Sequence, residues 1–170
     1  MKILIIGNGG REHAIAWKVS QNPKVEKIYA ALGNAGINLL EKGECVNLKT
    51  ADEILEFAVN NEIDLTVVGS EELLVEGIVD KFNEKNLKIF GPDKHAAQLE
   101  GSKVFSKNFM KKYGVKTAEY MTFSDSKKAL EYLTKSEYPV VVKASGLAAG
   151  KGVIIAQNKA EAEAAVNDIM

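Results

Sequence analysis

The chain has 170 residues, of which 46% are hydrophobic and 26% are charged, as in an ordinary globular protein. Twenty-two basic side chains stand against 23 acidic ones, and the formal net charge of −1 argues against nucleic acid and against a strongly basic partner. The length allows one domain, or one small domain and part of another.

The composition also bears on the compartment. Cys45 is the only cysteine, so no disulfide can form within the chain, and this favours a reducing environment. The N-terminus MKILIIGNGG has only four apolar residues before its first glycine, which is too short for a signal peptide or a membrane span. We therefore expect a cytoplasmic protein without a membrane partner.

Strands and helices alternate over the first 90 residues. Apolar runs that end near glycine or proline are typical of buried parallel strands. We expect five strands, at 2–7, 27–32, 44–48, 64–69 and 87–92. Such alternation predicts an α/β fold, with a Rossmann-like parallel sheet covered by helices on both faces.

Three helices are expected between these strands, at 11–22, 51–61 and 72–86. Their positions follow from helical spacing, from a capping box and from an apolar side. The residues are Ala14, Trp17 and Lys18 in the first helix, Thr50 and Glu53 at the start of the second, and Leu73, Val75, Ile78, Val79 and Phe82 in the third. Because ligands of such sheets bind beyond the carboxyl ends of the strands, the loops GNGG, GNAG, GSEE and GPDK are expected to line one crevice.

The pattern changes beyond residue 100. The segment 101–115 is expected to be helical, with an apolar side and a stop at Gly114. A short strand is expected at 118–123, a helix capped by Ser124 at 125–136, strands at 139–144 and 153–156, and a helix from Asn158 to the last residue. The last helix has no stop signal, so we expect the chain to be a piece of a longer protein.

The glycine cluster GNGGREHA at 7–14 follows the first strand. A dinucleotide fingerprint needs a third glycine where Glu12 stands, and an acidic residue near Gly33, so NAD and FAD are disfavoured. Free N–H groups at a helix start together with Arg11 favour a small phosphate monoester. A plain tight turn, with Arg11 and Glu12 solvated or paired locally, remains an alternative. Neither His13 nor His95 is assigned a catalytic role.

A second glycine loop, SGLAAGKG at 145–152, lies between two expected strands. Its small residues let the backbone approach a polyphosphate, while Lys143 and Lys151 supply positive charge. It is not a P-loop, because Gly152 replaces the serine or threonine that would hold magnesium and a strand follows. A hairpin lid over ATP fits better, and a surface hairpin with incidental lysines is the alternative.

Five segments, in this order and spacing, resemble the glycinamide ribonucleotide synthetase family of ATP-grasp ligases. They are IGNGGREHAIAWK, GNAG, IFGPDKHAAQLEGSK, TAEY and VVKASGLAAGKGV, and the resemblance covers essentially the whole chain. It implies an enzyme of purine biosynthesis, which joins glycine to 5-phosphoribosylamine through glycyl phosphate and converts ATP to ADP and phosphate. It also implies Mg²⁺, whose carboxylate ligands are expected outside this chain.

The resemblance assigns roles to particular positions. The sugar phosphate is expected at Asn8, Gly9, Gly10 and Arg11, and Glu71 is expected to bind ribose hydroxyls. ATP is expected at a second set of residues, Lys103, Lys143, Ser145, Gly146, Gly150, Lys151 and Gly152. Three positions depart from the family pattern, namely Leu32, Ser70 and Ser145. No catalytic or metal-binding side chain is assigned.

These segments suggest a domain plan and leave two alternatives open. We expect a Rossmann-like domain at 1–100, a connecting segment at 101–123 and a partial ATP-grasp lid at 124–170, inactive without the missing C-terminal part. One alternative is another ATP-grasp ligase, such as a biotin carboxylase or an aminoimidazole ribonucleotide carboxylase. The other is a non-catalytic module that binds a sugar phosphate.

Overall fold

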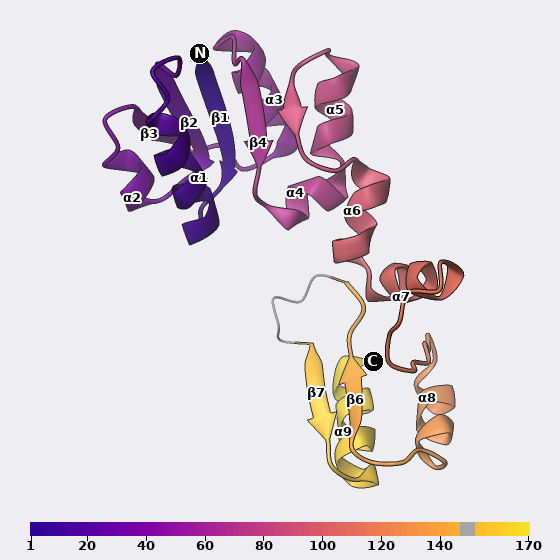
Figure 1. Ribbon diagram of the computed structural model, residues 1–170. Helices are drawn as coiled ribbons and strands as arrows, with labels where there is room; N and C mark the ends of the chain where they lie inside the picture. Colours follow the sequence, from indigo (N-terminus) through magenta and orange to yellow (C-terminus); the bar gives the residue numbers. More distant parts are fainter. Residues whose placement is uncertain (147–151) are drawn as a thin grey trace. The chain divides into compact units, whose positions relative to one another are not determined.

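The computed structural model describes residues 1–146 and 152–170. They divide into an N-terminal unit, Met1–Gln98, and a C-terminal unit, Leu99–Met170 (Figure 1). No helix in the described part of the chain is long and apolar enough to cross a membrane.

The N-terminal unit is built on a parallel sheet of five strands. In chain order they are β1 (Lys2–Gly7), β2 (Lys27–Leu32), β3 (Gly43–Val46), β4 (Leu65–Val68) and β5 (Ile89–Phe90). Their spatial order is β3-β2-β1-β4-β5, and every neighbouring pair is parallel. The predicted α/β fold is confirmed, although β5 is only two residues long. The order places β1 in the centre, between β2 and β4.

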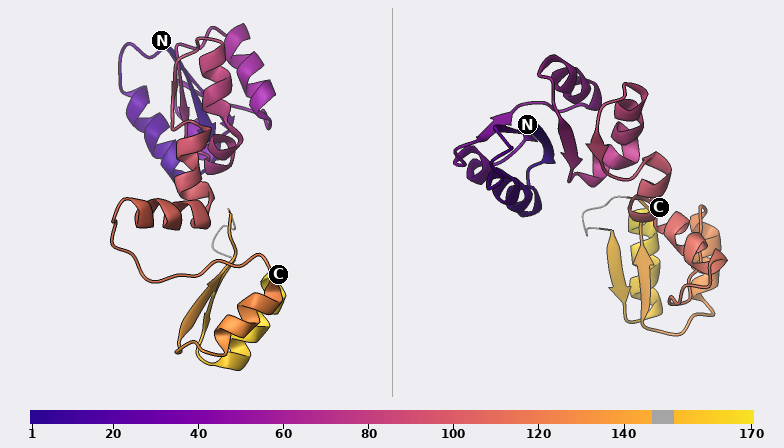
Figure 2. Two further views of the ribbon diagram at one scale, coloured as in Figure 1. Left: turned by 90° about the vertical axis from the view of Figure 1, so that its right-hand side faces the viewer. Right: turned by 45° about the horizontal axis from the view of Figure 1, so that its top comes forward.

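The helices of this unit lie on both faces of the sheet, as the left view of Figure 2 shows. They are α1 (Gly10–Ser20), α2 (Ala35–Asn38), α3 (Ala51–Asn60), α4 (Glu71–Glu76) and α5 (Ile78–Glu84). The short helix α2 was not expected. The single helix expected at 72–86 is wrong, because Gly77 adopts a left-handed conformation, with φ of +97°, and separates α4 from α5.

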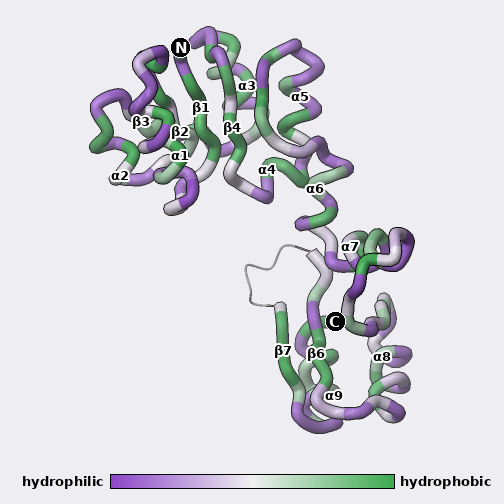
Figure 3. The backbone as a smooth tube through the Cα atoms, in the orientation of Figure 1, coloured by the Kyte–Doolittle hydropathy of each residue, from purple (hydrophilic) through white to green (hydrophobic). Residues whose placement is uncertain are grey.

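Successive side chains of β1 point to opposite faces of the sheet and pack into two separate parts of the core. Ile3 and Ile5 pack with α1 and α2, whereas Leu4 and Ile6 pack with α3, α4 and α5 on the other face. Figure 3 accordingly shows β1 as largely hydrophobic. The inward side of α1 differs from the expected spacing, because Ala16 is buried and Trp17 is 55% exposed.

The C-terminal unit holds a two-stranded antiparallel sheet and its helices. Its elements are α7 (Lys103–Lys112), α8 (Ser126–Leu133), β6 (Val140–Lys143), β7 (Val153–Ala156) and α9 (Lys159–Ile169), and α6 (Lys94–Gly101) runs across the division between the units. The apolar core of this unit joins α8, α9 and the hairpin through Leu133, Ala156 and Val166. The expected hairpin is therefore present.

Two local expectations in this unit are wrong. Residues 118–123 form no strand, because no strand in the described part of the chain pairs with them and α7 side chains bond to this stretch instead. Lys107 Nζ donates to Ala118 O at 2.9 Å, and Tyr120 Oη donates to Asn108 Oδ1 at 3.0 Å. The cap of α8 is Asp125 rather than Ser124, since the Asp125 carboxylate accepts backbone N–H bonds from the first turn.

Candidate functional site

The turn between β1 and α1 leaves backbone N–H groups free at the start of a helix. Gly7 ends β1 with a φ of +131°, Gly9 is the N-cap and Gly10 is the first helical residue. Among the described residues, no acceptor bonds to the backbone N–H groups of Gly10, Arg11 or Glu12. These donors carry the positive end of the helix dipole, so the turn can attract an anion.

Arg11, the only arginine in the sequence, bridges this turn to the loop after β4. Its Nε donates to Glu12 Oε1 at 3.0 Å, and its Nη2 donates to Gly69 O at 2.5 Å and to Glu71 Oε1 at 2.9 Å. Bonding to Glu12 and then to Glu71 raises the pKa of Arg11 above its ordinary value. Its Nη1 has no partner in the described part of the chain, so this nitrogen can meet a ligand.

Glu71 is the acidic partner in this arrangement, and it begins α4 directly after the β4 loop. Its own backbone N–H and, secondly, the Arg11 guanidinium hold the pKa of the Glu71 carboxyl below its usual range. The side chain is 43% exposed and can also accept hydrogen bonds from a ligand. The structure thus brings together Asn8, Gly9, Gly10, Arg11 and Glu71.

Two residues of this site were missed from the sequence. Glu12 is buried beneath the turn, and Asn34 of the GNAG loop ties two loops together. Asn34 Nδ2 donates to Asn8 O at 3.0 Å and to Gly9 O at 3.1 Å, while Asn34 Oδ1 caps α2. The signals were present, because glutamate three residues after a helix N-cap and asparagine before a helix are both capping patterns.

Of the four loops expected to share the crevice, three meet around Arg11 and Asn34. The fourth, 91–94, has a different anchor, since the Lys94 N–H donates to Asp80 Oδ2 at 2.8 Å.

In the C-terminal unit, the start of α7 lies beside the second glycine loop. Lys103 Nζ donates to Gly146 O at 2.8 Å. The lysine that is expected to contact ATP phosphates is therefore held next to Gly146. Lys143 is exposed at the end of β6, and Ser145 is exposed two residues later. Gly152 is buried, and its carbonyl accepts the Ala144 N–H at 2.8 Å. Gly150 and Lys151 lie outside the described residues.

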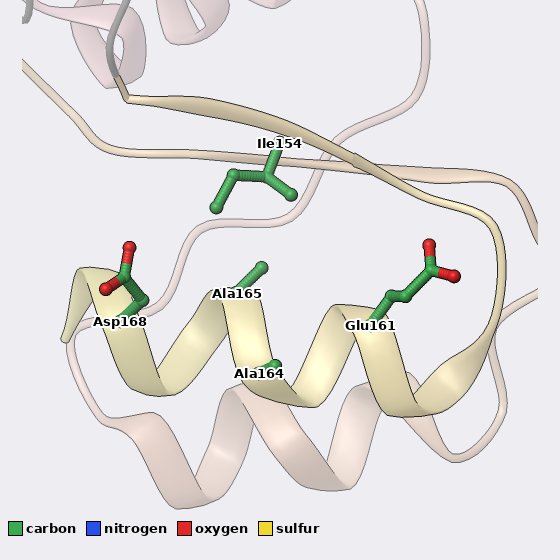
Figure 4. Close-up of a pocket in the computed structure, with 5 residues that line it drawn as sticks. All are labelled: Ile154, Glu161, Ala164, Ala165 and Asp168. Atoms are coloured by element: carbon green, nitrogen blue, oxygen red, sulfur yellow. The ribbon is translucent and has the colours of Figure 1, made fainter.

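A separate hollow of about 320 Å³ lies between β7 and α9. It is lined by Ile154, Ala164 and Ala165, with Glu161 and Asp168 at its two ends (Figure 4). Two carboxylates and an apolar floor disfavour a phosphate, and no expected site residue lines it. The Glu161 carboxylate also accepts the Gln157 N–H at 2.8 Å, next to the Asn158 cap of α9.

The described residues also bear on Mg²⁺. They contain no cluster of three or more histidine, cysteine, aspartate or glutamate side chains that could hold a metal ion. Glu12 and Glu71, the two acidic residues beside Arg11, are both already paired with its guanidinium. The donors described here therefore do not by themselves fit a magnesium site.

Two family models together match the whole chain. One, described as "Phosphoribosylglycinamide synthetase, N domain", matches residues 1–100. The other, described as "Phosphoribosylglycinamide synthetase, ATP-grasp (A) domain", matches residues 101–170. The chain belongs to the phosphoribosylglycinamide synthetase family.

Individual relatives agree with this family. A phosphoribosylamine–glycine ligase of Fusobacterium nucleatum is 66% identical over 170 residues, which are all of this chain and 40% of that protein. The crystal structure of a phosphoribosylamine–glycine ligase from Thermotoga maritima is 32% identical with a TM-score of 0.73, over 96% of this chain and 38% of that one.

A biotin carboxylase domain from Hydrogenobacter thermophilus, crystallised with MgADP and bicarbonate, shares the fold, with a TM-score of 0.75 over 98% of this chain and 40% of that one. At 23% identity it shows the fold alone. The chain thus spans about 40% of the length of the phosphoribosylglycinamide synthetase relatives.

Proposed function

We propose that this chain supplies the sugar-phosphate crevice and part of the nucleotide lid of a cytoplasmic phosphoribosylamine–glycine ligase. The complete enzyme would use ATP to activate the glycine carboxylate as glycyl phosphate, which the amine of 5-phosphoribosylamine attacks. The observation that carries the proposal is the Arg11 bridge, because it joins an anion-binding helix start to an exposed carboxylate.

The charges of the Arg11 bridge indicate that the phosphate and the sugar hydroxyls would bind at different groups in the crevice. Arg11 contributes one positive charge and Glu12 and Glu71 one negative charge each, so the three carry a net charge of −1. Such a cluster repels a phosphate, unless the phosphate contacts only hydrogen-bond donors and stays away from the two carboxylates. We therefore assign the phosphate to the turn N–H groups and to Arg11 Nη1.

The sugar hydroxyls fit the other end of the bridge. Glu71 Oε1 accepts from Arg11, and the exposed carboxylate has further lone pairs for hydroxyl donors. A ribose phosphate offers both chemistries in one molecule, namely an anion and neighbouring hydroxyls. This match supports a phosphorylated sugar rather than a free phosphate.

The nucleotide assignment rests on Lys103, Lys143 and the loop 145–152. Lys103 is held against the loop at Gly146 O, and Lys143 is exposed beside it. Both lysines can contact phosphates as point charges. We assign Ser145, Gly146 and Gly152 to the same lid and retain Gly150 and Lys151 in the proposal on sequence grounds. Magnesium would neutralise phosphate charge when bound, with its carboxylates supplied by the part of the enzyme that follows this chain.

The proposed domain plan remains 1–100, 101–123 and 124–170. The positioning of substrates and the neutralisation of phosphate charge would account for the chemistry, so no general acid or base is assigned within this chain.

The test compares the complete enzyme with the 170-residue chain. ADP formation is measured with ATP, Mg²⁺, glycine and 5-phosphoribosylamine, omitting each in turn. We expect the complete enzyme to need all of them and the 170-residue chain to form no ADP. Activity that depends on bicarbonate instead of glycine would indicate another ATP-grasp ligase. A complete protein that binds glycinamide ribonucleotide but forms no ADP would indicate a binding module.

A further inference from the structure

The most unusual buried group outside the expected site is the carboxylate of Glu12. The residue is 4% exposed, although a buried carboxylate is unfavourable unless donors satisfy it. Two donors do so, because the Gly9 N–H bonds to Oε2 at 2.7 Å and Arg11 Nε bonds to Oε1 at 3.0 Å. Both oxygens are thus engaged with groups that border the anion-binding turn.

Three glycines make room for this side chain. A Cβ built on Gly7 would lie 2.7 Å from Glu12 Cγ, one on Gly9 would lie 2.9 Å from Oε2, and one on Gly69 would lie 2.1 Å from Oε1. Gly7 ends β1, Gly9 lies in the turn that follows it, and Gly69 lies in the loop after β4. The glycine pattern of the crevice therefore serves a glutamate as well as a ligand.

The bonds of Glu12 fix which donors remain for a ligand. Gly9 N–H is occupied by Oε2, whereas the next three backbone N–H groups have no acceptor in the described part of the chain. Arg11 Nε is occupied by Oε1 and Nη2 by Gly69 O and Glu71, which leaves Nη1. The guanidinium is held along one edge and is open at one nitrogen.

We propose that Glu12 is a positioning residue for the sugar phosphate, acting through Arg11 and the Gly9–Gly10 turn. It holds the guanidinium plane and the turn in the arrangement that binds the phosphate, without contacting the ligand itself. This inference rests on the proposed function, since it assigns the crevice to that substrate.

The principal experiment measures steady-state kinetics of the complete enzyme with Glu12→Gln. The side-chain amide keeps the size but turns one acceptor into a donor that faces Gly9 N–H or Arg11 Nε. We expect the KM for 5-phosphoribosylamine to rise about tenfold or more, because a charged hydrogen bond is lost. The KM for ATP and kcat should stay within about twofold, because a positioning defect confined to the crevice leaves the nucleotide contacts intact.

The matched control is Glu53→Gln. Glu53 is also a glutamate in the third position of a helix, and it accepts the Lys49 N–H at 2.8 Å and the Thr50 N–H at 3.0 Å, with no contact to Arg11. It should leave the KM for 5-phosphoribosylamine within about twofold of the wild type. If Glu12→Gln behaves like this control, or raises every KM alike, the proposal is overturned.

Two further measurements keep the test decisive. Glu12→Asp retains the charge but is one methylene shorter, so it should give a smaller rise in the same KM. In the unsubstituted enzyme, the NMR signal of Arg11 Nε–H should remain protected when glycinamide ribonucleotide binds, while the Nη signals shift. Exposure of Nε–H by the ligand would overturn the proposal even if both variants failed to fold. A wild-type enzyme without phosphoribosylamine-dependent ADP formation would overturn the proposed function instead.

Discussion

Arg11 and Glu71 are 60 residues apart in the sequence, yet Arg11 Nη2 lies 2.9 Å from Glu71 Oε1. The contact depends on β1 and β4 being neighbours in the sheet, because each residue stands shortly after the end of one of these strands. The side chains of Arg11 and Glu71 are 60% and 43% exposed, so the pair by itself adds little to stability. We interpret it as a feature of the ligand crevice.

Replacing Arg11 with alanine should weaken the sugar phosphate and spare ATP. The loss of a charge-assisted phosphate contact predicts an affinity for glycinamide ribonucleotide lower by about tenfold or more. Calorimetry with each ligand on the complete enzyme checks this. Lys18→Ala removes a positive charge from the same helix and should leave both affinities unchanged; equal losses in the two variants would refute the prediction.

Replacing Lys143 with alanine should weaken nucleotide binding by more than about tenfold, for the same electrostatic reason. Lys127, exposed on α8 of the same unit, provides the control as Lys127→Ala. Nucleotide titrations of the complete enzyme would measure both. An unchanged affinity in Lys143→Ala removes this residue from the proposed lid site.

Replacing Gly69 with alanine should destabilise the N-terminal unit. The new Cβ would lie 2.1 Å from Glu12 Oε1, and the buried carboxylate has little freedom to move, so we expect a loss of about 1–3 kcal/mol. The thermal midpoint measures it. Gly10→Ala is the control for stability, since nothing lies within 4 Å of its Cβ position. A midpoint for Gly69→Ala equal to that of the control would contradict the packing described around Glu12.

The stability of α3 should depend on pH through Glu53. The backbone N–H groups of Lys49 and Thr50 lower the pKa of its carboxyl in the folded protein. A lowered folded pKa adds stability above the unfolded value of about 4.3, and that stability is lost as the pH falls through the folded pKa. Glu53→Gln should therefore be less stable than the wild type at pH 7, and the difference should shrink toward pH 3. Denaturation midpoints at both pH values test this, and a difference that grows on acidification would refute it.

The sequence predicted the elements of the sheet better than their arrangement. Apolar runs located all five parallel strands, but they contain no signal for an order with β1 in the centre. The helix expected at 72–86 was wrong because one glycine, Gly77, could take a left-handed conformation that its neighbours disfavour. The strand expected at 118–123 was wrong because a β-prone run forms a strand only where a partner is available.

The sequence pointed to individual residues of the candidate site but not to their connections. Arg11 was proposed from the glycine turn and Glu71 from the family resemblance, and their ion pair follows only from the strand order. In the sequence, Glu12 stands out only as the residue that replaces the third glycine of a dinucleotide fingerprint. Its burial depends on Gly69, which is distant in sequence, so local patterns alone could not reveal it.

The central place of β1 has a consequence for assembly during synthesis. Pairing with β2 requires only the first 32 residues, whereas the loop that carries Gly69 and Glu71 arrives after β4 has been made. In the folded structure, two of the three bonds of the Arg11 guanidinium go to this later loop. We expect a ribosome-bound chain to complete the proposed sugar-phosphate crevice in a single late step, when the fourth strand docks.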